Sequence, residues 1–233
     1  MTKRRLLTVG DSFTFGEECP QREQFAYPYL LKEQLGFDEI VNLGLPGGSS
    51  DYVFRTVIET LISDPEGFDL VSISWPEQSR FEAIHNHPDF VPTPTEPHIK
   101  PSVCLIRKIG KASPRKEPAW VQDYYKYSYD IAWGFRKQFN QILALQGFLK
   151  SRNQRYIMFN VAGLQGYYDQ YSEFLKNQFR EVDKEFFIGW PKNGILEFQG
   201  DCPKGPGGHP LELGHERIAK VINEHIRNLR WFS

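Results

Sequence analysis

The stretch that decides the fold lies near the amino terminus and reads Leu6-Leu7-Thr8-Val9-Gly10-Asp11-Ser12. A short apolar run that ends at a glycine is typical of a buried strand in a parallel sheet, because such strands are covered on both faces. In open sheets of this kind, ligands bind beyond the carboxyl ends of the strands. We therefore predict a first strand at residues 6–9, with Ser12 at the edge of the sheet where a site would form.

Outward from this strand, apolar runs alternate with segments of helical periodicity, which is typical of βαβ units. Further strands are predicted at residues 39–43, 70–74 and 155–160, with 185–188 as a candidate fifth strand. Helices are predicted around residues 28–35, from 51 along an apolar face that ends at 62, through 131–149, around 167–179 and from 210 to 229. The alternation predicts an α/β fold with a central parallel sheet of about five strands.

The alternation stops between residues 81 and 125. This stretch is rich in proline, with Pro88, Pro92, Pro94, Pro97, Pro101, Pro114 and Pro118. Neither a regular helix nor a central strand tolerates so many prolines, so we predict an irregular insertion over one end of the sheet. No repeat and no second domain is visible, and we expect a single domain over residues 1–233.

The composition excludes several classes of protein. Among 233 residues, 40% are hydrophobic and 24% are charged, and the formal net charge is -1. Nucleic acids and anionic membranes need a cationic face, so we expect neither as an obligatory partner. The three cysteines, Cys19, Cys104 and Cys202, form no disulfide framework and suit a reducing compartment. With no signal peptide or membrane span visible, we expect a cytoplasmic protein.

No metal or organic cofactor is expected. The polar residues His85, His87, Asp89 and His98 lie in the proline-rich insertion without a recognised zinc spacing. The insertion is locally basic, which is the ordinary character of a solvated loop and, less often, a contact for an acidic polymer. Its aromatic end, with Trp120, Tyr124, Tyr125, Tyr127 and Tyr129, either packs the insertion onto the domain or forms a wall for stacking sugars.

Polar residues that can carry chemistry follow the predicted strands. Ser12 follows the first strand, a glycine-rich turn with Gly47 follows the second, Gln78 and Arg80 follow the third, and His209 precedes the last helix. The carboxyl ends of parallel strands share one edge of the sheet, so we expect these residues to converge. Together they supply a nucleophile, backbone N–H donors for an oxyanion and a general base.

The chain resembles the SGNH (GDSL-type) hydrolase family over nearly its whole length, apart from the insertion. The resemblance is carried by Gly10-Asp11-Ser12, by Asn42 with Gly47 and Ser49, and by His209-Pro210 with Gly214-His215. It implies a flavodoxin-like three-layer α/β/α sandwich and hydrolysis of esters, often acetyl or acyl groups on glycans or lipids. It also implies Ser12 as nucleophile, His209 as base, and the amides of Ser12 and Gly47 as oxyanion donors. Pro210 would then occupy the first helical position and leave His209 as the cap.

Two positions depart from the family pattern. The family's third block usually has an asparagine that donates to the oxyanion, and here Gln78 stands at that place. The family usually has an aspartate three residues before the histidine, and here that position is Pro206. Either Asp201 reaches back to orient the ring or the site is a Ser–His dyad held by a backbone carbonyl.

Other side chains near the predicted site have plainer interpretations. Asp11 is expected to shape the turn by accepting nearby amides, and His215 to pack at the helix start. Arg80 either binds a carboxylate or phosphate of the substrate or forms a surface ion pair. His209 itself has an alternative role as an ordinary helix cap.

The function predicted from these residues is that of a serine esterase that acts through an acyl-enzyme and needs no cofactor. The favoured substrate is an O-acyl ester of a carbohydrate, a preference that rests on the resemblance and on the aromatic insertion. The alternative is a non-catalytic glycan-binding or structural module with a decayed active site. The departures at Pro206 and Gln78 favour this alternative, whereas Ser12, Gly47 and His209 oppose it.

Overall fold

The computed structural model describes residues 3–84, 103–106, 123–164 and 173–232. In chain order the elements are β1 (Arg5–Gly10), α1 (Ser12–Phe15), α2 (Arg22–Phe25), α3 (Tyr27–Leu35), β2 (Glu39–Gly44), α4 (Ser50–Ser63), β3 (Leu70–Trp75), β4 (Phe81–Ile84), β5 (Val103–Ile106), the π-helical turn η1 (Tyr124–Ser128), α6 (Ile131–Ser151), β6 (Tyr156–Asn160), α8 (Glu173–Glu181), α9 (Ile195–Gln199) and α10 (Glu212–Asn228). Residues 165–172, which hold the start of the helix predicted at 167–179, lie outside the described chain.

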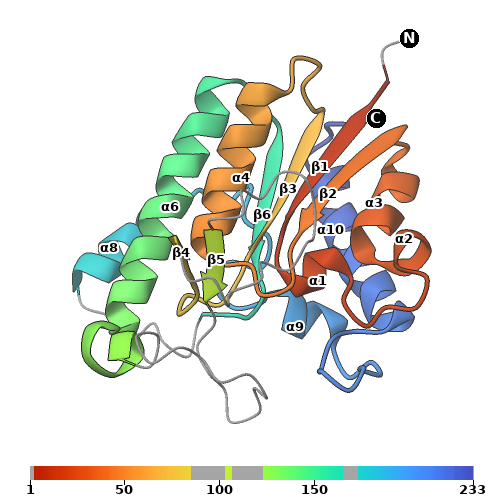
Figure 1. Ribbon diagram of the computed structural model, residues 1–233. Coiled ribbons are helices and arrows are strands. Elements are labelled where there is room, and N and C mark those ends of the chain that lie inside the picture. The colour runs from red at the N-terminus through yellow and green to blue at the C-terminus, as the bar shows by residue number, and fades with distance from the viewer. Residues whose placement is uncertain (1–2, 85–102, 107–122, 165–172, 233) are drawn as a thin grey trace.

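The main sheet has four parallel strands in the order β2-β1-β3-β6 (Figure 1). Strand β1 pairs on both sides, with Val9 beside Leu43 of β2 and beside Ile73 of β3. On the far side of β3, Trp75 pairs with Asn160 of β6. The carboxyl ends of all four strands therefore lie at one edge, and α1 begins at that edge.

The predicted fifth strand at residues 185–188 is reduced to a single parallel bridge between Met158 and Phe187. Two backbone hydrogen bonds attach it, from Met158 N to Phe186 O (2.7 Å) and from Ile188 N to Met158 O (2.8 Å). Before this bridge, the Glu185 amide donates a hydrogen bond to the Asp183 carboxylate. After it, Gly189 turns the chain with a φ of +73°. Because turns form at both ends of the 185–188 segment, its pairing with β6 cannot extend beyond this bridge.

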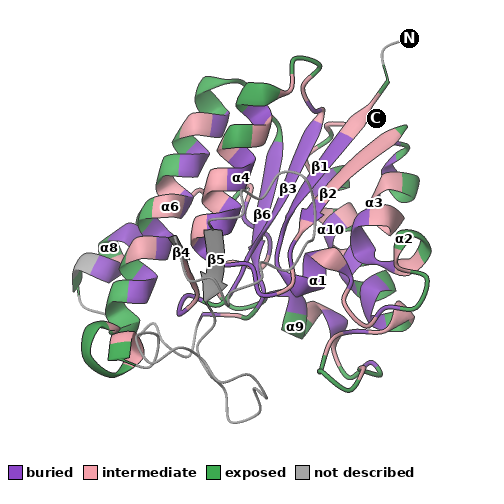
Figure 2. Cartoon of the chain, in the orientation of Figure 1, coloured by how far each residue is buried: buried purple, intermediate pink, exposed green. Residues whose placement is uncertain are grey.

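Helices cover both faces of the sheet and complete an α/β/α sandwich, as predicted (Figure 1). Helices α4 and α6 pack on one face, where Leu7 and Val9 of β1 join Val57 and Phe139 in one apolar core. Helices α3 and α10 pack on the other face, where Leu6 joins their buried side chains. Figure 2 shows β1, β3 and β6 buried along most of their length, which explains their largely apolar sequences, whereas the edge strand β2 is mostly half-buried.

The insertion is not irregular throughout, so that prediction was wrong at two places. The segments 81–84 and 103–106 pair as the antiparallel strands β4 and β5. Strand β4 is attached to α4, because Glu82 accepts from Arg55 and donates its own amide to Asp51. Both strands are free of proline, and the prolines that suggested an irregular segment lie at 88–101 and 114–118, outside the described residues.

The last helix begins later than predicted. Its first residue is Glu212 and its N-cap is Leu211, so Pro210 does not start the helix and His209 does not cap it. Instead Pro210 forms an isolated antiparallel bridge with Lys204, and Gly205 N donates to His209 O (2.9 Å). This turn holds residues 209 and 210 outside the helix. Among the described helices, none combines the length and apolarity that crossing a bilayer requires.

Candidate active site

Ser12 is the first residue of α1, directly after β1. Asp11 caps this short helix, with its carboxylate accepting the Phe13 amide at 3.1 Å. The Ser12 side chain is almost fully enclosed, since the residue is 4% exposed. The turn thus fixes a serine hydroxyl at the carboxyl edge of the sheet.

Two glycines allow α1 to lie tightly against the strands. A Cβ on Gly10 would stand 2.1 Å from Thr14 Oγ1, and a Cβ on Gly44 would stand 2.2 Å from the Phe15 nitrogen. Asn42 ties the same helix to β2, because its Nδ2 donates to Thr14 O at 3.0 Å. The glycine and asparagine positions of the sequence motif therefore set where Ser12 lies.

His209 comes from the other end of the chain and meets Ser12. Its Nε2 lies 2.9 Å from Ser12 Oγ, across 197 positions of sequence. Its ring also packs against Phe13, with the centroids 5.1 Å apart. A serine hydroxyl in hydrogen-bond contact with an imidazole is the arrangement that activates a nucleophile by general-base catalysis.

The carboxylate beside the ring is Glu18, which the sequence analysis did not identify. Glu18 Oε2 lies 3.1 Å from His209 Nδ1 and also accepts the His209 backbone amide at 3.1 Å. Asp201, which was expected to reach this ring, is exposed, whereas the next residue, Cys202, is buried. In the described chain no hydrogen bond links Asp201 to His209, so the expected placement of Asp201 is corrected to Glu18.

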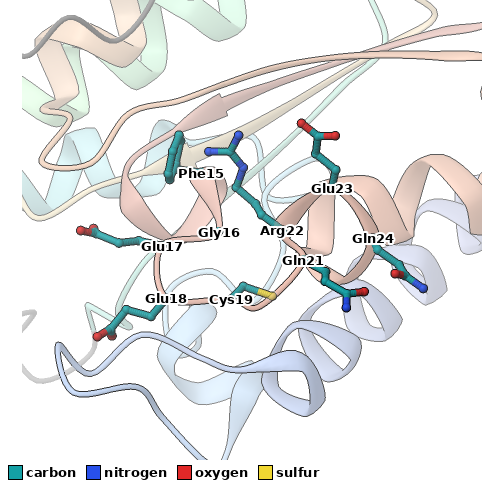
Figure 3. Close-up of a pocket in the computed structure, with 9 residues that line it drawn as sticks. All are labelled: Phe15, Gly16, Glu17, Glu18, Cys19, Gln21, Arg22, Glu23 and Gln24. Atoms are coloured by element: carbon teal, nitrogen blue, oxygen red, sulfur yellow. The ribbon is translucent and has the colours of Figure 1, made fainter.

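A second glutamate contacts the ring from the other side. Glu17 Oε2 lies 3.4 Å from His209 Nε2, the same nitrogen that faces Ser12. Figure 3 shows Glu17 and Glu18 adjacent on the turn that follows α1. This turn lines an open hollow of about 660 Å³ whose wall also includes Phe15, Gln21 and Arg22, with the Arg22 guanidinium over the Phe15 ring.

The residues expected to bind an oxyanion are buried at the carboxyl edge of the sheet, where Ser12 lies. Ser12 and Gly47 are buried, and Gln78 is 7% exposed. Within the part of the chain that the structure describes, neither the two backbone amides nor the Gln78 side chain donates a hydrogen bond. The amide of a first helical residue has no partner inside its own helix, which explains why that of Ser12 is unused.

Arg80 forms an ion pair, but not at the surface. Its Nη1 lies 2.8 Å from Asp11 Oδ2 and 3.2 Å from Gly48 O. Asp11 is fully buried and the Arg80 side chain is 19% exposed. These contacts tie Arg80 to the back of the turn that carries Ser12, and Asp11 shapes that turn through Phe13 as expected.

His215 lies behind the site and is completely buried. Its Nδ1 accepts the Tyr27 amide at 3.2 Å, and its ring stacks on that of Tyr27. Burial, and after it the neighbouring His209, lowers the pKa of His215 to about 4. The ring is therefore neutral and joins α3 to α10.

Aromatic residues at the end of the insertion pack against one another. The ring of Tyr124 lies 4.3 Å from that of Phe81 and 5.3 Å from that of Tyr125, whose hydroxyl donates to Ser79 O. Trp120 lies outside the described residues, as do His85, His87, Asp89 and His98. Among the residues that are described, no cluster of three or more His, Cys, Asp or Glu side chains could hold a metal ion.

Residues 16–232 match the model of a family that is described as a family of unknown function (DUF6071). The chain belongs to this family. The range matched by the family model includes Glu17, Glu18 and His209. It begins four positions after Ser12. Comparison with curated proteins found no match.

Solved structures show the fold. The DUF6071 chain is similar to the psychrotrophic esterase EstA from Pseudoalteromonas sp., with 14% identity, a TM-score of 0.55 and coverage of 97% of this chain and 98% of that one. It is also similar to TesA (14%, TM-score 0.57, coverage 97% and 99%) and to AlinE4, an SGNH-hydrolase family esterase (14%, TM-score 0.50, coverage 98% and 97%). The DUF6071 chain therefore has the fold of the SGNH esterases.

Proposed function

We propose that the protein is a serine esterase in which Ser12 attacks the ester carbonyl and His209 accepts the serine proton. The observation that carries this proposal is the 2.9 Å contact between His209 Nε2 and Ser12 Oγ. These two groups are separated by most of the chain, yet they meet at the edge where open sheets bind ligands. A binding module would not need this contact.

The reaction would proceed in two halves. Ser12 Oγ forms a bond to the carbonyl carbon while its proton passes to His209 Nε2, and the tetrahedral intermediate then expels the alcohol, which takes that proton from the imidazolium. In the second half, His209 takes a proton from water as the water oxygen attacks the acyl-Ser12 carbonyl. The carboxylic acid leaves and the proton returns to Ser12.

The negative charge on the carbonyl oxygen would be stabilised by the amides of Ser12 and Gly47 and by the side-chain amide of Gln78. Their burial and their unused hydrogens support this role. Each such donor contributes roughly 10²–10³ in rate in enzymes where one has been removed. Gln78 would do the work of the family's asparagine with one more methylene.

The substrate we propose is a short acyl ester, such as an acetyl group, on a carbohydrate. Glu17 and Glu18, which contact His209, also line the open hollow, and its wall has further charged and amide side chains, including Gln21 and Gln24 (Figure 3). Hydroxyl-rich alcohols suit such a surface, whereas long acyl chains need an enclosed apolar channel. A sugar alcohol therefore fits this wall better than a lipid tail does.

The first experiment measures hydrolysis of p-nitrophenyl acetate by the wild type and by Ser12→Ala. We expect clear turnover by the wild type and loss of at least about 10³ in kcat for Ser12→Ala, because the covalent step is removed. A fluorophosphonate should label the wild type at Ser12. EstA, one of the similar structures, was solved inhibited by monoethylphosphonate, a related class of reagent.

The controls separate the two candidate functions. Equal rates for the two proteins, absence of turnover in both, or a label on a residue other than Ser12 would contradict the esterase and favour the glycan-binding module. For the substrate, release of acetate from acetylated xylan is compared with hydrolysis of p-nitrophenyl palmitate. Faster hydrolysis of the palmitate would contradict the carbohydrate ester.

A further inference from the structure

We propose that Glu18 is the positioning residue that holds His209 in its working orientation and tautomer. The carboxylate of this site would thus come from the turn six positions after the nucleophile, and not from the segment before the histidine. This inference rests on the proposed function and deepens it.

One carboxylate organises both the loop and the ring. Glu18 Oε1 accepts the Gly207 amide at 2.6 Å, while Oε2 accepts the His209 amide and faces His209 Nδ1, each at 3.1 Å. The backbone contacts fix where the histidine is attached, and the third contact fixes the rotation of its ring. A side chain that served folding alone would not need the contact to Nδ1.

The loop before His209 is shaped to admit this carboxylate. A Cβ on Gly205 would stand 2.7 Å from Glu18 Oε2, and one on Gly207 would stand 3.1 Å from it. Glu18 itself has a φ of +65°, a left-handed conformation that residues with a side chain rarely adopt. Strain of this kind persists where surrounding contacts fix the residue, and it concentrates at functional sites.

The chemistry follows from what a carboxylate can do. An ionised carboxylate only accepts hydrogen bonds, so its contact selects the tautomer with the proton on Nδ1. Nε2 then carries the lone pair that faces Ser12 Oγ. The pKa of Glu18 is lowered by the Gly207 amide and then by the amide and ring of His209, which keeps the carboxylate ionised at neutral pH.

The neighbouring glutamate cannot take this role. Glu17 approaches His209 at Nε2, the nitrogen that must stay open to Ser12 and to the leaving alcohol. In Figure 3 the two side chains extend from the turn in different directions, and Glu18 points toward the C-terminal loop. The position where the family usually has its acid is Pro206, which has no carboxylate.

The test compares Glu18→Gln with a matched control, Glu197→Gln. Glu197 also accepts two glycine amides, from Gly194 at 2.6 Å and from Gly163 at 3.0 Å, but among the described residues no hydrogen bond or ion pair joins it to a histidine. For each variant, kcat and KM are measured with p-nitrophenyl acetate, and the melting temperature checks the fold. The tautomer of His209 is assigned from its ring ¹⁵N shifts, with His209→Asn identifying the signals.

We expect Glu18→Gln to lower kcat by roughly 10²–10⁴ with little change in KM, because the substrate surface remains but the base is misdirected. The wild type should show the Nδ1-protonated tautomer and Glu18→Gln should lose it. Glu18→Asp should recover part of kcat. Glu197→Gln should keep kcat and the tautomer near those of the wild type.

Equal kcat values for Glu18→Gln and Glu197→Gln, or an unchanged tautomer in Glu18→Gln, would overturn the inference. If Glu18→Gln does not fold, Glu18→Asp is measured in its place. In Glu18→Asp, a proton on Nε2 of His209 would overturn the inference. A proton that stays on Nδ1, together with a reduced kcat, would support it. If the wild type neither turns over nor labels at Ser12, the proposed function fails. The ¹⁵N comparison still decides the role of Glu18.

Discussion

Asp11 shows how a single residue serves both the fold and the site. Its carboxylate caps α1 in front of Ser12 and pairs with Arg80, although it is itself fully buried. A buried charge is tolerated only where it is paired and hydrogen-bonded. The pair therefore fixes the turn that carries Ser12 from behind, and Arg80 supports this turn.

Replacing Arg80 by Met should destabilise the protein by about 3 kcal/mol, because Asp11 would be left buried and unpaired. The measurement is urea unfolding at pH 7. Arg180→Met is the matched control, since Arg180 pairs with Glu173 at the surface, with the two side chains 56% and 71% exposed. We expect less than about 1 kcal/mol there. Equal losses would mean that the Asp11 pair is no more important than a surface pair.

At this scale the meeting of Ser12 and His209 could be predicted from the sequence, whereas the role of Glu18 could not. The positions of Ser12 and His209 follow from the ends of the predicted strands and from the spacing of the motifs, which are local patterns. The contact between Glu18 and His209 spans 191 positions and depends on a left-handed backbone at a glutamate and on the shape of a glycine-rich loop. An acidic residue soon after the nucleophile was the one available signal, and many surface glutamates give the same signal.

Among the elements, the packing of α3 against α10 depends on a buried histidine. His215 accepts the first amide of α3 through Nδ1, and its Nε2 has no hydrogen-bond partner among the described residues. Burial lowers its pKa to about 4, well below the ordinary value of 6.5. The unfolded chain therefore binds a proton at a pH where the folded protein does not.

This linkage predicts an acid-sensitive fold. As the pH falls from about 6.5 to 4, protonation of His215 in the unfolded chain should reduce stability by up to about 3 kcal/mol, at most about 1.4 kcal/mol per pH unit. His215→Asn keeps an acceptor for the Tyr27 amide but cannot be protonated. Its unfolding free energy should depend less on pH over this range. Parallel pH curves for the two proteins would contradict the assignment.

The sequence predicted most elements to within a few residues because the apolar periodicity of strands and helices is local. It misplaced the start of α10, since the rule that favours Pro at the first helical turn competes with the bridge between Lys204 and Pro210. It also missed the short helices α1, α2 and α9 and the strands β4 and β5. Strands of four residues beside many prolines carry too little pattern to be recognised.

On the scale of the whole molecule, one sheet supports two apolar cores. Successive residues of β1 point to opposite faces, so Leu6 lies in the core under α3 and α10 while Leu7 lies in the core under α4 and α6. The regular alternation of strands and helices was sufficient to predict this α/β/α arrangement. The structure of the insertion could not be predicted in this way, because its placement depends on contacts with α4.

Because both cores share β1, damage to either should lower the stability of the whole. Phe139→Ala on one face and Ile222→Ala on the other, both at fully buried positions, should each cost about 3 kcal/mol. Each variant should still unfold in one transition, measured by circular dichroism and by tryptophan fluorescence. Two separate transitions in either variant would show that the faces unfold independently.

The position of His209 has a consequence for biosynthesis. Ser12 and Glu18 leave the ribosome before His209, whose imidazole follows 197 positions after the serine and is held in place by a loop that leads into α10. A growing chain therefore has Ser12 long before it has His209. On the proposed chemistry, the nascent polypeptide stays inert toward cellular esters until the segment that carries His209 has been made and folded.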